Sequence, residues 1–286
     1  MFKNTMKTTV LLGAMGGLIV AVAGIVGGGS SASLMIGLGL AFVMVGGSYW
    51  FSDKLALKSA KARVITEAEA PEFYGMIRSL AERANMPMPT VAISPNDQPN
   101  AFATGRGPKH AVVCATQGLL ETLTRDEVEG VMAHELMHVK HRDILIGSIA
   151  AAIATAISFI AQMAMFSAMF GGRDRRNNIV GMLAMSLLAP IAASLIQMAV
   201  SRSREFEADR GAARLLGGGE SLARALEKIE VIAARRPMAV APAQAQAYIH
   251  NPLAEARSRR GGGPNLAKLF STHPATDERV RRLRAI

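Results

Sequence analysis

Uncharged apolar stretches alternate with charged, amphipathic stretches along this chain. Charged side chains are absent from Thr8–Ser52, from Ile144–Gly172 and from Asn177–Ser201. The first of these stretches has room for two membrane helices of about 20 residues each. Its turn lies at Gly27–Ser31, and the other two stretches flank the basic loop Arg173–Arg176. The pattern therefore predicts four hydrophobic helices, arranged as two hairpins.

The basic residues beside the first hairpin predict its orientation. Lys3 and Lys7 precede it and Lys54 and Lys58 follow it, whereas the turn between its helices carries no Lys or Arg. Because such residues mark the cytoplasmic side of a membrane, both flanks are expected there. A secretory signal peptide is the competing interpretation of the first span, but a second span follows at once, which favours a retained anchor.

The predicted organisation has four parts. Residues 1–52 form the first hairpin, residues 53–143 the first soluble part, residues 144–201 the second hairpin, and residues 202–286 the second soluble part. If the second hairpin crosses the membrane fully, the arginines in its turn lie on the side opposite the cytoplasm, which is contrary to the preference of Lys and Arg for the cytoplasmic side. Full crossing and partial insertion are both open, and in either case the two soluble parts face the same compartment.

Helical and strand patterns predict an α+β fold in the first soluble part. A helical pattern covers Ala60–Asn85, and the β-rich runs Thr90–Ile93 and Ala111–Cys114 predict strands. Another helix is expected to begin after Thr124, because Glu127 three residues later completes a capping box. In the second soluble part, the sequence predicts two longer helices, a loop rich in Pro, Ala, Gln and Gly, and a short basic helix at the end of the chain.

The formal net charge of +10 raises the question of nucleic-acid binding. Only 5% of the residues are aromatic and none interleaves with a basic patch, so nucleic acid is not an expected partner. Basic residues beside apolar spans are better matched to anionic lipid headgroups. The single cysteine, Cys114, excludes an intrachain disulfide and is expected to be a small buried apolar residue.

The strongest chemical signal is the segment His134-Glu135-Leu136-Met137-His138 in the helix expected after Thr124. Residues four apart share a helix face, with Cβ atoms about 5–6 Å apart, so the two histidines can bind one zinc ion. Glu135 is then placed to act as general base toward a metal-activated water. The combination predicts a zinc peptidase. The alternative is a chance motif in which Glu135 is an ordinary surface residue.

A catalytic zinc site needs a third protein ligand. His141 lies about 10.5 Å further along the helix than His134, and no glycine bends the chain back. Glu205 is the stronger candidate, because it begins a Glu-x-x-x-Asp pattern on a predicted helix that can pack beside the first. Asp209, one helical turn after Glu205, is placed to orient a ligating histidine. The alternative is that Glu205 and Asp209 belong to a solvated acidic face. Asp143 is expected to cap or solvate the end of the first metal helix.

With these residues in hand, the chain resembles the HtpX family of membrane-bound zinc endopeptidases, which are relatives of the CAAX prenyl proteases among the gluzincins. The resemblance is carried by the two pairs of apolar spans and by these segments: Pro99–Gly105, His134–His138, Ser201–Asp209 and Thr272–Pro274. It implies an α-rich integral membrane protein, with four hydrophobic helices and a zincin-like α+β metallopeptidase domain.

The resemblance also implies roles for the site residues. It places one zinc ion per chain on His134, His138 and Glu205, with Glu135 as the general base and Asp209 as a carboxylate behind the ligands.

Two further residues are candidates for contacts with the substrate. By resemblance, His273 approaches the site and stabilises the oxyanion; the alternative is a helix-start residue before Pro274. Asn100 and the backbone after it are candidates for binding an extended peptide at a sheet edge. We also hypothesise that the loop Pro237–Pro264 covers the cleft, because of its composition and position.

The expected function is hydrolysis of peptide bonds in misfolded or damaged membrane proteins, as envelope quality control, and self-cleavage is a further expectation. The implied location is the bacterial inner membrane, with several spans and the peptidase domain facing the cytoplasm. Protein substrates and the lipid bilayer are the expected partners, and the oligomeric state is open. A site-specific processing protease of the CAAX type is one alternative, although four spans are too few to enclose a chamber. A non-catalytic zinc scaffold is the other, although such a site has no use for Glu135.

Overall fold

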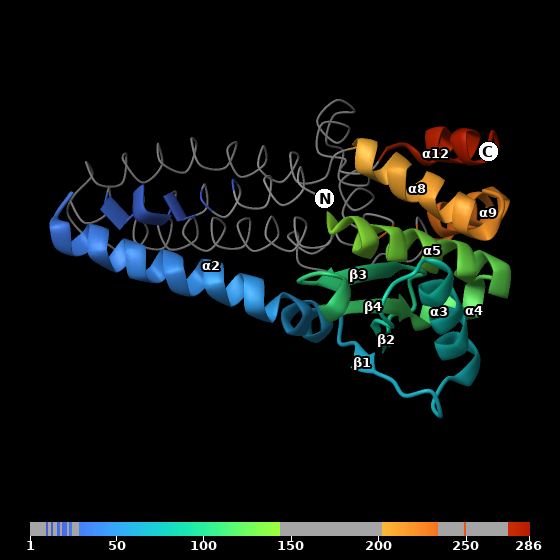
Figure 1. The fold of residues 1–286 in the computed structure, drawn as a ribbon, viewed down its shortest axis with the longest axis horizontal. Coiled ribbons are helices and arrows are strands. Elements are labelled where there is room, and N and C mark those ends of the chain that lie inside the picture. Colours follow the sequence, from blue (N-terminus) through green and yellow to red (C-terminus); the bar gives the residue numbers. More distant parts are fainter. Residues whose placement is uncertain are drawn as a thin grey trace.

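The computed structural model of this chain describes residues 29–143, 202–233 and 274–286, together with Ile249 and isolated positions between 10 and 24. Figure 1 shows a long helix that leads into a sheet covered by further helices. The elements in chain order are α2 (Ser31–Ser59), β1 (Arg63–Val64), α3 (Pro71–Arg83), β2 (Thr90–Ser94), β3 (Ala101–Gly105), the 3-10 turn η1 (Pro108–His110), β4 (Ala111–Thr116), α4 (Gln117–Thr122), α5 (Arg125–His141), α8 (Arg202–Leu216), α9 (Glu220–Ala233) and α12 (Thr276–Leu283).

Helix α2 extends away from the sheet (Figure 1). It begins after Ser30, whose hydroxyl oxygen accepts a hydrogen bond from the backbone N–H of Ser33 at 3.2 Å. Its 29 residues correspond to a length of about 43 Å at 1.5 Å per residue. Near its end, Ala56 and Leu57 pack against the sheet, so this helix is anchored to the rest of the fold at one end.

The two hairpins predicted from the sequence fall largely outside the described residues. Residues 144–201, which contain the second hairpin, are outside, as is most of the first helix of the first hairpin. In the part of the chain that is described, no helix combines the length and the apolar character needed to cross a membrane. The predicted combination of many helices with a small sheet is confirmed, whereas the membrane part of the fold class stays a prediction.

Within the described ranges, four strands form a mixed sheet in the order β1-β2-β4-β3. The central strands β2 and β4 are parallel, with Val91 opposite Val113, and the outer strands β1 and β3 pair antiparallel with them. The predicted strands Thr90–Ile93 and Ala111–Cys114 are confirmed as β2 and β4. The sheet therefore ends at β3, which is the edge strand next to α5.

Alternate residues of the strands face two different cores, as the two-residue period of a strand requires. Val91 and Val113 belong to the large core shared with α3 and α5, whereas Phe102 and Cys114 belong to a smaller core closed by Ala60 just after α2. Burial raises the pKa of the Cys114 thiol to about 12. Cys114 is fully buried, as predicted.

The helix predicted over Ala60–Asn85 is shorter in the structure, and the prediction was wrong for residues 60–70. Helix α3 begins at Pro71. Proline suits this position because its φ is already helical, and because an N–H in the first turn of a helix would have no partner within the helix. The preceding residues instead form β1, which pairs with β2. The predicted apolar stripe of the helix is buried: Phe73, Ile77 and Leu80.

Helix α5 lies between the sheet on one side and α8 and α9 on the other (Figure 1). Its first turn is fixed by Glu127, whose carboxylate accepts a hydrogen bond from the backbone N–H of Thr124 at 2.9 Å. The same carboxylate accepts a hydrogen bond from Lys228 Nζ of α9 at 2.8 Å. The predicted start of this helix is thus also the point where α9 attaches.

Glycines let α8 and α9 approach α5 closely. A Cβ atom on Gly130 of α5 would lie 2.8 Å from the backbone nitrogen of Leu222 in α9. A Cβ atom on Gly211 of α8 would lie 2.7 Å from Cγ of Met137 in α5. Both distances are shorter than van der Waals contact. A side chain at Gly130 would therefore push on the backbone of α9, and one at Gly211 would displace the Met137 side chain or α8.

Replacement of Glu127 by Gln tests the attachment of α9 to the first turn of α5. Glu127→Gln keeps an acceptor for the Thr124 N–H but loses the charge that Lys228 contacts. We therefore expect the free energy of unfolding to fall by about 1 kcal/mol at pH 7. Urea denaturation of the purified chain measures this change, and Glu121→Gln, on the exposed side of α4, is the matched control with no expected change.

The same variant should show a defined pH dependence. Burial raises the pKa of Glu127, but Lys228 and the Thr124 N–H outweigh it and hold the pKa below its ordinary value of 4.5. A carboxyl group with a lower pKa in the folded state stabilises the fold above its unfolded pKa, and this stabilisation is lost as the pH falls through the folded pKa. The difference between the wild type and Glu127→Gln should therefore shrink below pH 4.5. A difference that persists unchanged in acid would contradict this account.

Candidate metal centre

Helix α5 brings the two histidines of the motif together. Their Nε2 atoms lie 3.1 Å apart, as expected for side chains one turn apart on a single face. The His134 side chain is 1% exposed and the His138 side chain is 14% exposed. The pair therefore lies at the inner end of a site that opens on the side of His138.

Glu205 joins the two histidines from α8. Its Oε1 atom lies 3.4 Å from His138 Nε2, and its Oε2 atom lies 3.7 Å from His134 Nε2. Among the residues that the structure describes, His134, His138 and Glu205 form a group whose potential ligand atoms all lie within 4.8 Å of one another. Two imidazoles and one carboxylate in this arrangement can hold a single metal ion.

A carboxylate and a guanidinium lie behind His134. The Nδ1 atom of His134 is 2.9 Å from Oδ1 of Asp209. Arg279 of α12 donates two hydrogen bonds to the same carboxylate, from Nη2 to Oδ1 at 2.7 Å and from Nε to Oδ2 at 2.9 Å. Arg279 is 2% exposed and its charge holds the pKa of Asp209 well below the usual range despite burial. Asp209 is therefore ionised and fixed in orientation.

Arg279 was not among the site residues predicted from the sequence. It lies in a terminal helix with several other arginines, so its residue type alone does not distinguish it. The available signal was its spacing, because Arg279 lies four residues before the buried Leu283 and next to the buried Val280. An arginine on the apolar face of a short helix needs a buried anionic partner, and Asp209 is that partner.

Asp143 lies behind the second histidine. Helix α5 ends two residues before Asp143, and Oδ2 of Asp143 lies 3.3 Å from Nδ1 of His138. Oδ1 of Asp143 forms an ion pair with Nε of Arg204 in α8 at 3.9 Å. Asp143 was expected to cap or solvate the end of the helix, whereas its side chain is 7% exposed and contacts a candidate ligand.

The two histidines have opposite pKa shifts. Burial lowers the pKa of His134 to about 4, despite its hydrogen bond to Asp209. Burial also opposes charge on His138, but the carboxylates of Glu205 and Asp143 outweigh it and raise the pKa of His138 to about 10. His134 is therefore neutral, as a metal ligand must be, and His138 is in a site that attracts positive charge.

The buried charges around the centre favour a divalent cation. The carboxylates outnumber the guanidiniums by four to two: Glu135, Asp143, Glu205 and Asp209 against Arg204 and Arg279. With both histidines neutral, this leaves a net charge of −2 in a region shielded from water, where uncompensated charge is costly. A divalent metal ion on the three ligands would neutralise it, so the residues present fit a metal.

Glu135 is 3% exposed and lies near the histidines. Its negative charge contributes to the raised pKa of both His138 and Arg279. His141, rejected as a ligand, is not part of the three-residue group. His273 lies outside the described residues, so its expected role stays a prediction.

Asn100 lies at the start of β3 and is fully buried. Its side-chain oxygen accepts a hydrogen bond from the backbone N–H of Ala101 at 3.1 Å, and its carbonyl oxygen accepts one from the N–H of Thr116 at 2.9 Å. These contacts fix the start of the edge strand. A direct contact of Asn100 with substrate stays a prediction.

One described residue of the Pro237–Pro264 loop contacts the edge strand. The backbone N–H of Ile249 donates a hydrogen bond to the carbonyl oxygen of Ala101 at 3.0 Å, and Ile249 is 3% exposed. Ile249 thus lies against β3, and the hypothesis that the loop covers the cleft stays a prediction. The neighbouring residues of Ile249 lie outside the described part of the chain.

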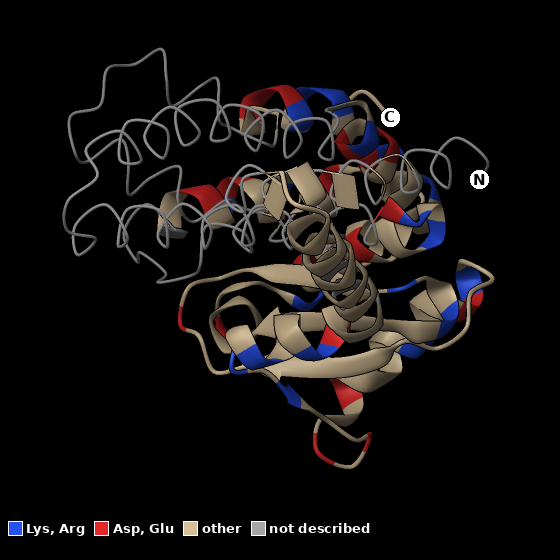
Figure 2. Cartoon of the chain, turned by 90° about the vertical axis from the view of Figure 1, so that its left-hand side faces the viewer, with Lys and Arg blue, Asp and Glu red and all other residues tan. Residues whose placement is uncertain are grey.

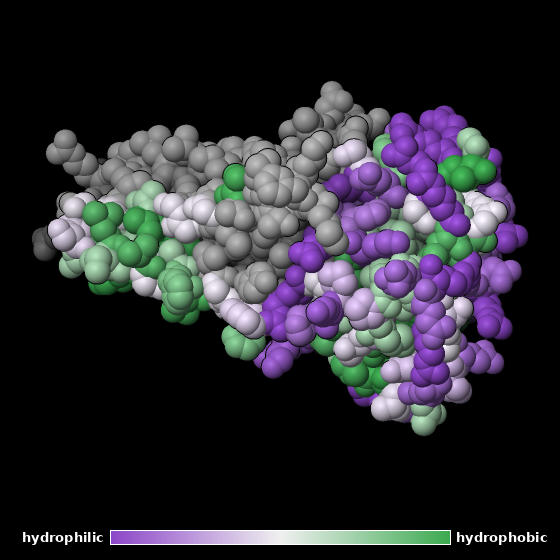
Figure 3. Space-filling model, in the orientation of Figure 1, coloured by the Kyte–Doolittle hydropathy of each residue, from purple (hydrophilic) through white to green (hydrophobic). Residues whose placement is uncertain are grey.

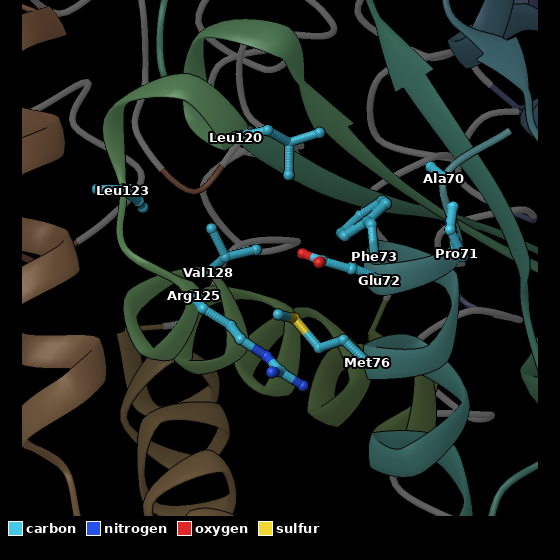
Figure 4. A pocket seen from close by; sticks show the side chains of 9 residues that line it. All are labelled: Ala70, Pro71, Glu72, Phe73, Met76, Leu120, Leu123, Arg125 and Val128. Carbon is cyan, nitrogen blue, oxygen red and sulfur yellow. The ribbon is translucent and has the colours of Figure 1, made fainter.

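A cavity lies near the other end of α5, between α3, α4 and the first turn of α5 (Figure 4). Its volume is about 490 Å³. Glu72 and Met76 extend from α3 toward Val128 in α5. It shares no residue with the group His134, His138 and Glu205, so it is separate from the metal centre.

Comparison with known proteins gives a family match and close relatives. Residues 67–286 match peptidase family M48. Proteins named "Protease HtpX homolog" from Burkholderia mallei and Burkholderia pseudomallei are each 52% identical to this chain over 288 residues. These alignments cover 98% of this chain and 96% of each relative. The similarity therefore extends over nearly the full length of both proteins.

A solved structure has a similar fold. The crystal structure of S. mikatae Ste24p matches with a TM-score of 0.52 and 19% sequence identity. The match covers 99% of this chain and 65% of that chain, so this chain spans about two thirds of the other protein. At this identity the likeness concerns the fold alone.

Replacement of Glu205 by Ala tests the three-residue group. Loss of a partner behind a ligand typically weakens metal binding by about 10–100-fold, and loss of a ligand should weaken it more. We therefore expect Glu205→Ala to raise the dissociation constant for Zn²⁺ by more than about 100-fold. Competition with a chromophoric chelator measures this constant. Glu207→Ala, exposed on the same helix, should bind as the wild type does, and an equal loss in both variants would contradict the assignment.

Proposed function

The chain belongs to peptidase family M48, and we propose that this metalloprotease is a zinc endopeptidase acting at a bacterial membrane. The observation that carries the catalytic proposal is the convergence of His134, His138 and Glu205 within 4.8 Å, next to the buried Glu135. Two histidines and one glutamate are a ligand set of catalytic zinc sites, which keep one position open for water or substrate.

In the proposed mechanism, His134, His138 and Glu205 hold the zinc ion. When bound, zinc supplies a Lewis acid that polarises the scissile carbonyl and lowers the pKa of a water. Glu135 accepts the proton of the attacking water and later gives it to the leaving amine. Asp209 accepts the Nδ1–H of His134, which keeps Nε2 free to face the metal.

His273 is proposed to stabilise the oxyanion that forms on the scissile carbonyl. This role follows from the family resemblance of the segment Thr272–Pro274, and a hydrogen-bond donor at that oxygen would lower the barrier to peptide hydrolysis.

The substrate is proposed to lie along β3 as an extended peptide. In an antiparallel pair, alternate residues direct their N–H and C=O groups away from the partner strand. The carbonyl oxygen of Asn100 accepts a hydrogen bond from Thr116 at the end of β4, whereas the carbonyl oxygen of Ala101 accepts one from Ile249. Because the orientation alternates along the antiparallel strand, Ala101 and Ala103 both direct their backbone groups away from β4. The outward groups of Ala101 already bond to the Asn100 side chain and to Ile249, so the substrate is proposed to pair with the edge at Ala103. Backbone pairing there would hold peptides of many sequences, as expected of a protease for misfolded proteins.

The membrane proposal is supported by the surface of α2. Large apolar side chains on this helix are exposed, including Ile36 at 70% and Phe42 at 81%. Figure 3 shows hydrophobic surface along α2 and hydrophilic surface over the sheet and its covering helices. Figure 2, in which α2 points toward the viewer, shows the charged residues over the sheet and helices, while the near turns of α2 carry none. Such an apolar surface is rare on soluble monomers and is suited to lipid.

The end of this apolar surface has the features of a membrane interface. Trp50 is 60% exposed, and the guanidinium of Arg106, from the turn after β3, lies 4.3 Å from the centre of its ring. Lys54 and Lys58 follow on α2 and are exposed. Tryptophan and basic residues together favour the cytoplasmic headgroup layer. We therefore propose a multi-pass protein of the inner membrane whose peptidase part faces the cytoplasm.

Misfolded or damaged membrane proteins are the proposed substrates, and self-cleavage is a second proposed reaction. The 52% identity over nearly the full chain links this protein to relatives named HtpX homologues. The likeness to Ste24p is confined to the fold at 19% identity, so a processing protease of the CAAX type is less well supported. A non-catalytic scaffold does not agree with membership in a peptidase family.

Replacement of Glu135 by Gln tests the mechanism. A general base contributes about 10²–10⁴-fold to a rate, so Glu135→Gln should cleave unfolded casein at least about 100-fold more slowly while keeping one zinc ion per chain. Purified wild type, Glu135→Gln and the exposed control Glu207→Gln are compared for cleavage and zinc content. Undiminished cleavage by Glu135→Gln with zinc bound would overturn the role of Glu135.

A further inference from the structure

Each histidine of the metal centre has a carboxylate and an arginine behind it. For His138 these are Asp143, with Oδ2 3.3 Å from Nδ1, and Arg204, with Nε 3.9 Å from Oδ1 of Asp143. The arrangement parallels the pair of Asp209 and Arg279 behind His134, with longer distances. The first pair comes from α8 and α12, whereas the second joins the end of α5 to the start of α8.

A left-handed residue brings Asp143 under His138. On a continuing helix, a residue five positions later would point about 140° away from His138. Helix α5 instead ends at Arg142, which has φ 62° and ψ 27°, and the N–H of Arg142 donates to the carbonyl oxygens of His138 and Val139. This left-handed residue takes the backbone off the helical path, so Asp143 approaches the ring nitrogen that faces away from Glu205.

The contacts of Asp143 lie in a buried part of the site. The side chains of Asp143 and Arg204 are 7% and 9% exposed, so water screens their charges weakly. A carboxylate at Nδ1 of a ligating histidine fixes the ring and raises its strength as a donor. The arginine in turn limits the positions that the carboxylate can take. Arg204 also directly precedes Glu205, so movement of α8 would change a ligand and this pair together.

We propose that Asp143 is a positioning residue for His138, held in place by Arg204, and that this pair sets how tightly the centre binds zinc. The inference rests on the zinc centre proposed above. It assigns a function to the contact between Asp143 and Arg204, which lie on the two segments that flank residues 144–201. On this proposal, zinc affinity depends on the packing of α8 against the end of α5.

Zinc affinity of the full-length chain tests the proposal without relying on catalysis. Asp143→Asn keeps the shape and an acceptor but removes the charge, so we expect the dissociation constant for Zn²⁺ to rise by about 10–100-fold. The visible absorption of the cobalt-loaded chain should also shift, because the donor strength of His138 changes. Asp126→Asn, exposed at the start of α5, is the matched control and should change neither quantity.

A double-variant comparison tests whether Arg204 acts through Asp143. Arg204→Gln alone should weaken zinc binding by a smaller factor than Asp143→Asn. The double variant should be no weaker than Asp143→Asn alone, because residues that act through one contact are not additive. Arg210→Gln, exposed on the same helix, should leave zinc affinity unchanged. Independent, multiplying losses would overturn the link between Arg204 and Asp143.

The turn at Arg142 supplies a second test if Asp143→Asn does not fold. Valine strongly disfavours the left-handed conformation and glycine adopts it freely. Arg142→Val should therefore weaken zinc binding, and Arg142→Gly should keep it. Zinc affinity within twofold of the wild type in Asp143→Asn or Arg142→Val, with an unchanged cobalt spectrum, would overturn the role of Asp143 but leave the proposed function intact. A wild-type chain that binds no zinc would overturn the proposed function as well.

Discussion

The packing of α8 against α5 is the contact on which the metal centre depends. The two histidines belong to α5, while Glu205 and Asp209 belong to α8, and the sequence between these helices is long. Neither helix alone holds a complete ligand set. Nitrogen–oxygen distances of 3.4 and 3.7 Å between the facing ligand atoms leave little tolerance for displacement, since a metal needs all three ligands within a narrow range of distances. The fold of this part of the chain therefore determines the distance between α5 and α8.

Electrostatics explains why the centre is surrounded by arginines. Burying several carboxylates together is unfavourable unless cations accompany them. Arg279 and Arg204 pair with the carboxylates behind the histidines and offset part of their charge. Arg279 also lies close to the facing ligand atoms, with Nη1 3.8 Å from Oε2 of Glu205 and Nη2 3.4 Å from Nε2 of His134. The remaining negative charge is matched to one dication. The arginines and the proposed metal ion thus share the same set of carboxylates.

The part of the site that could be predicted from sequence is the part with short spacing. His134, Glu135 and His138 are defined by one helical turn, and Glu205 and Asp209 by another, so their residue types and periodicity carried the information. The contacts of Arg279, and that of Asp143 with Arg204, form only when separate segments pack. The position of Asp143 also depends on a left-handed conformation at Arg142, which arginine does not favour and which the sequence therefore did not predict. In the fold, the strands β2 and β4 were predicted from β-rich runs, whereas the two-residue strand β1 is too short to give a pattern and exists through its pairing with β2.

The close approach of Gly211 and Met137 also determines what oxidation of this methionine would do to the centre. The Sδ atom of Met137 would lie 2.8 Å from a Cβ atom on Gly211, so the space beside this sulfur is already filled by the neighbouring helix. Conversion of methionine to its sulfoxide adds a polar oxygen to the sulfur. At Met137 that oxygen would need room between the helix that carries the histidines and the helix that carries Glu205. Oxidation of this one thioether would therefore strain the contact between the two helices that carry the candidate ligands without modifying any of those ligands, and reduction of the sulfoxide would relieve it.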